Sequence, residues 1–259
     1  MPPSNTIPWI PRSAAYAMMV LSRGIAWTSL LAWMAFVLVG PLELMPLGLT
    51  EPAALALDAC LSLAFFVQHS VMIRRSFRQR SAGFIPSHYQ GAVFSIVSGI
   101  VLWGLVVFWQ ASSQTLAVAG DPVRWLLRAT FVLALVGFAW GILALRLFDP
   151  FGLEPIRGYL RGRDPATVPF CIRGPYRWVR HPLYLFMLLM IWSAPDLTLD
   201  RLLFNVLWSG WIIVAAALEE RDLVAIYGEP YRHYQRRVPM LIPYRRPQTD
   251  TGDVDNVSS

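Results

Sequence analysis

The stretch Ala53–Ile73 reads AALALDACLSLAFFVQHSVMI and is followed directly by the basic run RRSFRQR at residues 74–80. About 20 consecutive apolar residues are what an α-helix needs to cross the hydrocarbon core of a membrane. Arginines in a short segment beside such a helix tend to stay on the cytoplasmic side. This stretch therefore predicts a membrane-spanning helix whose carboxyl end faces the cytoplasm.

The composition of the whole chain agrees with a membrane protein. Of its 259 residues, 56% are apolar and only 15% are charged, which is unusual for a soluble domain. The formal net charge of +6 would suit nucleic acid, but arginines in short loops between apolar segments are what membrane topology itself requires. No nucleic-acid partner is expected. Cys60 lies in an apolar run and Cys171 in a polar connector, so neither a disulfide nor a metal site is expected.

Three more apolar segments have the length of a membrane span, and they are Ala14–Gly40, Tyr89–Trp109 and Val123–Leu147. Two further apolar runs, Leu183–Ala194 and Leu202–Leu218, follow a polar connector. The first run is too short to cross alone, so we expect a helical hairpin in which it packs on the second. The expected fold is an all-α polytopic membrane helix bundle with about five to six membrane segments.

The arginines are distributed unevenly between the connectors. The connectors at residues 41–52 and 110–122 contain no basic residue, whereas those at 74–88 and 149–180 are rich in arginine. Because positive charge in short loops stays inside, we expect both termini to be cytoplasmic. The membrane is expected to be the bacterial inner membrane.

The residues best suited to chemistry crowd into the last third of the chain. Arg180-His181-Pro182 opens the short arm of the hairpin, where free amides and the positive end of the helix dipole suit an anion. Glu219 and Glu220 are expected to close the long arm, where two carboxylates at a negative dipole end need a cationic partner. Together the two ends predict a pocket for a ligand with both a carboxylate and an ammonium group.

Each group also has a purely structural interpretation. The segment Arg173–Arg180 would serve as an interfacial anchor, with Tyr176 and Trp178 in the aromatic belt. The segment Glu219–Asp222 would serve as a solvated helix end. The hairpin favours the pocket, because it brings a basic segment and an acidic one to the same face of the membrane.

These motifs resemble the isoprenylcysteine carboxyl methyltransferase family of membrane enzymes. The similar motifs, in order, are RGPY at 173–176, RHPLY at 180–184, EERDL at 219–223, GE at 228–229, Tyr231, Tyr234, VP at 238–239 and IP at 242–243. Within that family, five features look most like the branch that methylates methanethiol: LFD at 147–149, FGL at 151–153, EERDL at 219–223, VPMLIP at 238–243 and His69-Ser70.

The resemblance implies S-adenosylmethionine as the cofactor, held on the cytoplasmic side by the hairpin and the segment that follows it. On this basis we assign Arg180 and His181 to the cofactor carboxylate, and Glu219 and Glu220 to its ammonium group and ribose hydroxyls. Tyr184 would line the pocket. The remaining cofactor-binding candidates are Arg221, Tyr231 and Tyr234.

The same resemblance implies a small thiol as the methyl acceptor, with methanethiol giving dimethyl sulfide. Arg180 and His181 are the candidate catalytic residues. A thiol must lose its proton and histidine titrates near neutrality, so His181 is the first candidate base and His69 the second. Phe186 departs from the family pattern, which commonly has glycine there, and a ring at this position would narrow the pocket.

Two alternatives remain open. A lipid-borne acceptor, either an isoprenylcysteine carboxylate or a phospholipid amine, would need a lateral opening between helices. A non-catalytic haem-binding or respiratory accessory protein would need paired histidines well inside the spans, and only His69 and His88 lie near span ends.

The expected domain organisation has three parts. Residues 1–147 form a four-helix transmembrane region, residues 148–247 form a membrane-embedded catalytic region, and residues 248–259 form a disordered polar tail. The expected partners are a small or lipid-soluble methyl acceptor and membrane lipid.

Overall fold

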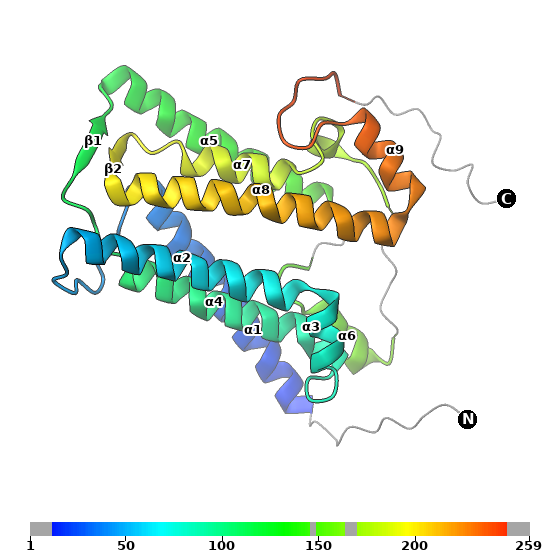
Figure 1. Ribbon diagram of the computed structural model, residues 1–259. Coiled ribbons are helices and arrows are strands. Elements are labelled where there is room, and N and C mark those ends of the chain that lie inside the picture. Colours follow the sequence, from blue (N-terminus) through cyan, green and yellow to red (C-terminus); the bar gives the residue numbers. More distant parts are fainter. Residues whose placement is uncertain (1–11, 146–148, 164–169, 248–259) are drawn as a thin grey trace. The chain divides into compact units, whose positions relative to one another are not determined.

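A computed structural model describes residues 12–145, 149–163 and 170–247; the predicted tail lies outside these ranges. Among the described residues, five helices are long and apolar enough to cross a membrane. They are α1 (Arg12–Val39), α2 (Glu51–Ile73), α4 (Gln90–Phe108, preceded by the 3-10 turn η1, Ser87–Tyr89), α5 (Asp121–Ala144) and α8 (Leu199–Tyr227) (Figure 1). A shorter apolar helix, α7, spans Pro182–Ile191. The structure confirms the predicted all-α polytopic membrane bundle, and the protein is an integral membrane protein.

The remaining elements are short. They are the helices α3 (Arg75–Ser81), α6 (Glu154–Arg161) and α9 (Glu229–Arg237), the 3-10 turn η2 (Gly174–Arg177), and the strands β1 (Thr115–Val118) and β2 (Asp196–Thr198). The two strands pair antiparallel, with Thr115 opposite Thr198. Strand β2 occupies the predicted turn of the hairpin, so the chain reverses there between α7 and α8.

Contacts divide the chain into two compact units that interleave along the sequence. Of the described residues, the first unit holds 12–124, 149–163 and 194–211, and the second holds 125–145, 170–193 and 212–247. Helices α5 and α8 therefore begin in the first unit and continue in the second. The predicted division at residue 147 stays a prediction.

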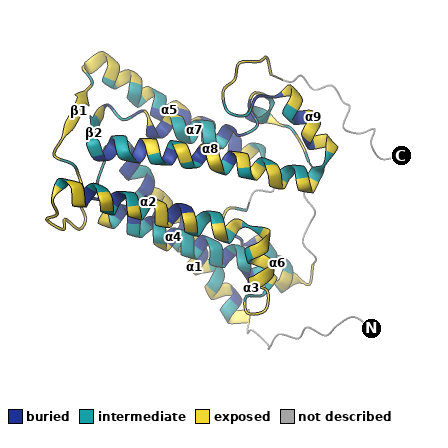
Figure 2. Ribbon diagram, in the orientation of Figure 1, coloured by how far each residue is buried: buried dark blue, intermediate teal, exposed yellow. Residues whose placement is uncertain are grey.

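In the first unit, α4 packs against both α1 and α2. The ring of Phe36, on α1, is completely buried and meets Trp109 and Phe204 edge to face, with ring centroids 5.3 and 5.1 Å away. Figure 2 shows exposed faces along the same helices, where Leu31 is 61% and Val67 is 62% exposed. Large apolar side chains exposed along a span are expected to face lipid.

Charged side chains buried near the starts of α2 and α8 hold neighbouring chain segments. Asp58 accepts a hydrogen bond from the backbone amide of Gln110 (3.0 Å), and Asp200 accepts one from the Trp109 indole (3.1 Å). Arg201 donates to the carbonyl oxygens at the carboxyl end of α1, those of Phe36 (3.0 Å) and Val37. Backbone groups at helix ends need such partners because the hydrocarbon core supplies none.

The FGL motif at 151–153 packs against α1 and α4 within the first unit. Ser22 of α1 donates a hydrogen bond to the Phe151 carbonyl (2.7 Å), and Ser95 of α4 donates to the Pro150 carbonyl (3.1 Å). Gly152 has φ +66° and lies directly on the backbone of Gly91; a Cβ at Gly152 would be 2.2 Å from the Gly91 carbonyl carbon. Only glycine tolerates both the left-handed backbone and this approach, so the motif anchors the connector to α1 and α4.

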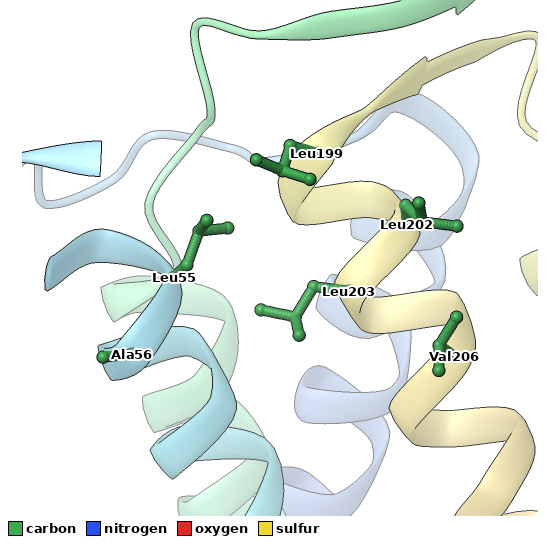
Figure 3. A pocket seen from close by; sticks show the side chains of 6 residues that line it. All are labelled: Leu55, Ala56, Leu199, Leu202, Leu203 and Val206. Atoms are coloured by element: carbon green, nitrogen blue, oxygen red, sulfur yellow. The ribbon is translucent and has the colours of Figure 1, made fainter. Parts of the chain in front are cut away.

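A groove of about 430 Å³ lies between α2 and the start of α8 in the first unit (Figure 3). Its lining is entirely apolar: Leu55, Ala56, Leu199, Leu202, Leu203 and Val206. A small-molecule site usually combines an apolar lining with a few polar groups that orient the ligand. The groove lacks such polar groups, so it does not suit a charged ligand.

Candidate active site

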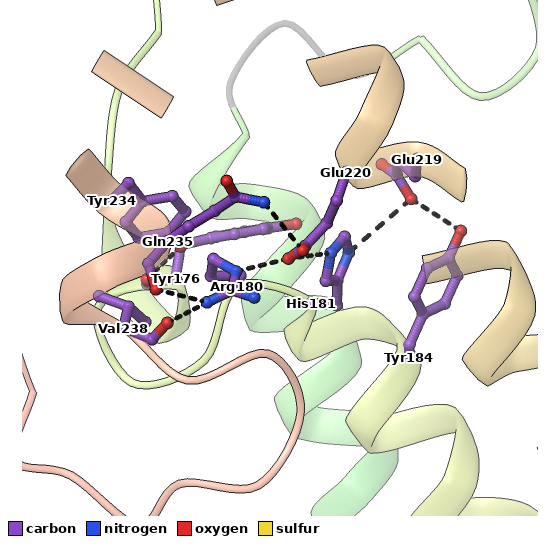
Figure 4. A network of polar contacts seen from close by, with 9 residues as sticks. All are labelled: Tyr176, Arg180, His181, Tyr184, Glu219, Glu220, Tyr234, Gln235 and Val238. Carbon is purple, nitrogen blue, oxygen red and sulfur yellow. Dashed lines mark hydrogen bonds and ion pairs between the residues drawn. The ribbon is translucent and has the colours of Figure 1, made fainter. Parts of the chain in front are cut away.

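The polar cluster forms where the segment before α7 meets α8 and α9 (Figure 4). The backbone amides of Arg180 and His181 donate to the carbonyls of Pro239 (2.9 Å) and Met240 (3.1 Å). These two bonds tie the RHP motif at 180–182 to the segment that begins with the VP motif. Arg180 and Val238, which are also hydrogen-bonded, are 58 residues apart in the sequence. His181 precedes Pro182, the first residue of α7, where the missing amide hydrogen costs no hydrogen bond.

Arg180 is held by protein groups from α8 and from the end of α9. Its Nε lies 2.5 Å from Oε1 of Glu220, and its Nη1 donates to the carbonyls of Gln235 (3.0 Å) and Val238. The side chains of Arg180 and Glu220 are only 10% and 13% exposed. Arg180 thus links α8 to the end of α9 through Nε and Nη1, and its predicted contact with a cofactor carboxylate stays a prediction.

Glu220 is the centre of the cluster. Besides Arg180, it accepts a hydrogen bond from the Gln235 side-chain amide (3.0 Å), and Nε2 of His181 lies 3.3 Å from its Oε1. A carboxylate with three such partners inside a protein is well compensated for its loss of water. Its position and orientation are therefore fixed before any ligand arrives.

Glu219 presents the more accessible carboxylate. Its side chain is 46% exposed and accepts a hydrogen bond from the Tyr184 hydroxyl (2.9 Å), while Nδ1 of His181 lies 3.8 Å from the same oxygen. The rings of His181 and Tyr184 are stacked, with centroids 5.5 Å apart. The structure thus brings His181 between two carboxylates and leaves Glu219 able to bind an added cation.

The prediction that Glu219 and Glu220 close α8 was wrong. The helix continues for about two more turns to Tyr227 and stops before Gly228, whose φ is +62°. The two carboxylates therefore project from the side of a continuous helix. Their compensation comes from Arg180, His181 and Tyr184 rather than from free groups at a helix end.

Tyrosines from α9 and η2 form one wall of the cluster. Tyr234 donates its hydroxyl hydrogen to the Tyr176 carbonyl (2.6 Å), and Tyr231 is only 2% exposed. The Tyr231 hydroxyl makes no hydrogen bond of normal geometry among the described residues, but the Arg180 side chain lies close enough to donate to it. Burial raises the pKa of Tyr176, Tyr231 and Tyr234, so these hydroxyls stay protonated at neutral pH.

Two predicted site residues take no part in the hydrogen bonds described for this network. Arg221 is exposed on α8, and the hydrogen bonds and ion pairs within the described cluster do not include it. His69 belongs to the first unit, where its ring is surrounded by Phe65, Phe94 and Trp211 at centroid distances of 5.3, 4.9 and 5.5 Å. Its Nδ1 is buried without a hydrogen-bond partner among the described residues.

Sequence reasoning missed Gln235 and the carbonyls of Gln235 and Val238. Gln235 follows Tyr231 by four residues, so the two share one face of α9 at the usual α-helical spacing. That spacing was the available signal for the side chain of Gln235. The two carbonyl acceptors carry no side-chain signature.

The spans and the site together define a class: a polytopic membrane protein with an accessible carboxylate beside a histidine near one end of its helices. Comparisons with known proteins make the class specific. A methanethiol S-methyltransferase from Pseudomonas sp. (strain GM41(2012)) is 36% identical over 203 residues, covering 76% of each chain. Another, from Mycobacterium tuberculosis, is 32% identical over 197 residues, covering 74% of this chain and 79% of its own.

The chain therefore belongs to the methanethiol S-methyltransferase family of membrane enzymes, and it is a methyltransferase that uses a methyl donor. A more distant relative, Nurim from Rattus norvegicus, is 26% identical over 201 residues, covering 71% of this chain and 73% of its own. No protein-family profile matches the chain, and neither does any solved structure. The enzyme relatives confirm the family predicted from the motifs and decide against the haem-protein alternative.

Proposed function

We propose that this enzyme transfers a methyl group from S-adenosylmethionine to methanethiol, giving dimethyl sulfide. One observation carries the location of the site: the half-exposed Glu219 carboxylate, oriented by Tyr184 beside His181. The methanethiol S-methyltransferase relatives support the acceptor.

The residues present fit the donor. S-Adenosylmethionine carries a sulfonium and an ammonium cation, and a carboxylate that keeps an open side suits either of them. Glu219 would hold the ammonium group, with Glu220 fixing His181 and Arg180 behind it.

The reaction needs a thiolate and an aligned methyl group. When bound, S-adenosylmethionine would supply an electrophilic methyl carbon for the acceptor sulfur, with its own sulfur as the leaving group. The protein must remove the thiol proton, and we assign this step to a ring nitrogen of His181, with His69 as the second candidate. Alignment and exclusion of water supply most of the acceleration expected for such a transfer.

The membrane setting suits this acceptor. An anionic sulfur and a cationic sulfonium lose charge as they react, so a site poor in water destabilises the reactants more than the transition state. A small volatile thiol also dissolves in lipid. The arginines of α3 and α6 support the proposal that both termini are cytoplasmic. We propose the bacterial inner membrane as the location.

A methyl-transfer assay tests this function. Detergent-purified enzyme is given labelled S-adenosylmethionine with methanethiol, a prenylcysteine analogue or phosphatidylethanolamine, each offered separately. We expect label in dimethyl sulfide and background counts with the two lipid-type acceptors. Transfer to the prenylcysteine analogue or the phospholipid instead would show that methanethiol is not the acceptor. Donor binding without transfer to methanethiol would refute the proposal.

A matched pair of variants tests the site. Glu219→Gln should weaken donor binding at least tenfold, since a charged hydrogen bond to a cation contributes about 1.5–3 kcal/mol. The control is Glu229→Gln on α9, whose carboxylate is also well exposed and pairs with Arg236 (2.7 Å). Equal donor affinity in the two variants would remove Glu219 from the site.

A further inference from the structure

The ring of Phe186, on α7, lies in the space that a side chain at position 137 of α5 would occupy. A Cβ built on Gly137 would be 2.4 Å from Cε1 and 2.5 Å from Cζ of that ring, closer than real Cβ contacts. Both residues belong to the second unit. Phe186 and Gly137 are therefore a size-matched pair: the large side chain on one helix requires the absent side chain on the other.

The same arrangement continues along α5. A Cβ on Gly141 would be 2.6 Å from Cδ2 of Leu183, one helical turn before Phe186. A Cβ on Gly174, in η2, would be 3.1 Å from the Ala144 methyl. The segment from η2 into α7 thus lies on α5 at successive turns, and small residues permit this close approach, as they commonly do between membrane helices.

The opposite side of α7 carries the active site. Tyr184 precedes Phe186 by two residues, which places the two side chains about 200° apart around the helix. Tyr184 and His181 contact Glu219 and Glu220 of α8. Helix α7, which has 10 residues, therefore lies between α5 and the part of α8 that carries Glu219 and Glu220. A change in where α7 packs on α5 would move His181 and Tyr184 relative to these carboxylates.

We propose that Phe186 is a positioning residue: its ring, seated against Gly137, sets the position of α7 along α5 and thereby the placement of His181 and Tyr184 relative to the two carboxylates. The role rests on the proposed function, because donor binding is what this placement serves. Misplacing groups at a site by about 1 Å can cost on the order of a hundredfold in rate. Phe186 itself acts through α7 and not on the donor.

A rescue experiment tests the pair. Gly137→Ala puts a methyl group into the ring of Phe186, and we expect the dissociation constant for S-adenosylmethionine, measured by titration calorimetry on the full chain, to rise at least tenfold. Phe186→Leu alone should change it by less than threefold. The double variant should bind at least threefold more tightly than Gly137→Ala, because the shorter side chain makes room for the methyl group.

Two controls separate positioning from general damage. Gly104→Ala makes the same change in α4, where a Cβ would have nothing within 4 Å, and should bind the donor as the wild type does. Ile156→Ala removes a fully buried side chain from the first unit and should lower the thermal midpoint while leaving donor affinity unchanged. A Gly137→Ala variant that only loses stability, as Ile156→Ala does, would overturn the proposal.

The other outcomes are equally decisive. A double variant as impaired as Gly137→Ala would overturn the pairing of the two positions. If Gly137→Ala does not fold, Phe186→Ala replaces it. The space left beside Gly137 should raise the donor dissociation constant at least threefold, and wild-type affinity would overturn the proposal. A wild-type enzyme that binds no S-adenosylmethionine would instead refute the proposed function.

Discussion

Arg180 and Glu220 form a nearly buried ion pair, 2.5 Å from Nε to Oε1, that joins the start of α7 to the side of α8. The pair is part of the protein before any ligand binds, because Gln235 and Val238 of the α9 region complete the hydrogen bonds of Arg180. A neutral pair at this place leaves the net negative charge of the cluster on Glu219. The pair therefore builds the site, and the accessible carboxylate beside it is available for recognition.

Removing one partner of this pair should be more damaging than removing both. Arg180→Met leaves Glu220 without its cation, and loss of one member of a buried pair typically costs about 3–5 kcal/mol. Arg180→Met combined with Glu220→Leu should recover part of the thermal midpoint, because two apolar side chains can replace a buried pair. Donor binding should stay lost in both variants. A double variant less stable than Arg180→Met alone would contradict this account.

Replacing Tyr184 with Phe should weaken donor binding without unfolding the site. The change removes the hydroxyl that holds Glu219 at 2.9 Å and keeps the ring stacked on His181. A neutral or charge-assisted hydrogen bond of this kind contributes about 0.5–3 kcal/mol, so we expect the donor KM to rise roughly threefold or more with a smaller change in kcat. An unchanged donor KM would show that Glu219 does not depend on Tyr184.

The spans were predictable because hydropathy over about 20 residues reflects a requirement of the bilayer itself. The end of α8 was not, because the charged run at 219–222 ends the apolar pattern although glutamate and arginine favour a helix. The first strong stop is Gly228, where the backbone is left-handed. Hydropathy thus locates the membrane part of the helix, whereas backbone preferences locate its end.

The candidate site was predictable as a set of residue types more than as a set of contacts. The sequence places Arg180, His181, Tyr184, Glu219 and Glu220 in neighbouring motifs, and the structure brings all five together. That Arg180 binds Glu220 could not be inferred, since a guanidinium fits a protein carboxylate as well as a ligand carboxylate. Which one it meets depends on packing between segments distant in sequence.

Alkaline pH should destabilise the second unit through its buried tyrosines. Burial, with a further contribution from the nearby Glu220 charge, raises the pKa of Tyr231 in the folded state. The stability that the protonated hydroxyl allows is fully present below the unfolded pKa of about 10 and is lost as pH rises through the folded value. Thermal midpoints should therefore fall above about pH 10, and Tyr231→Phe should reduce this fall. An equally steep fall in that variant would assign the effect to other groups.

Two arginines of the first unit should differ sharply in their effect on stability. Arg201 is 3% exposed and donates to carbonyls at the end of α1, so Arg201→Met leaves buried acceptors unmade, at a cost of about 1–3 kcal/mol. Arg124 pairs with Asp196, but these side chains are 33% and 46% exposed, so solvent screens the pair and its contribution to stability is small. Arg124→Met should therefore shift the thermal midpoint much less. Donor affinity should be unchanged in both variants, because the proposed donor site is built from the second unit. Equal falls in the thermal midpoint would mean that burial does not determine how much these arginines contribute to stability.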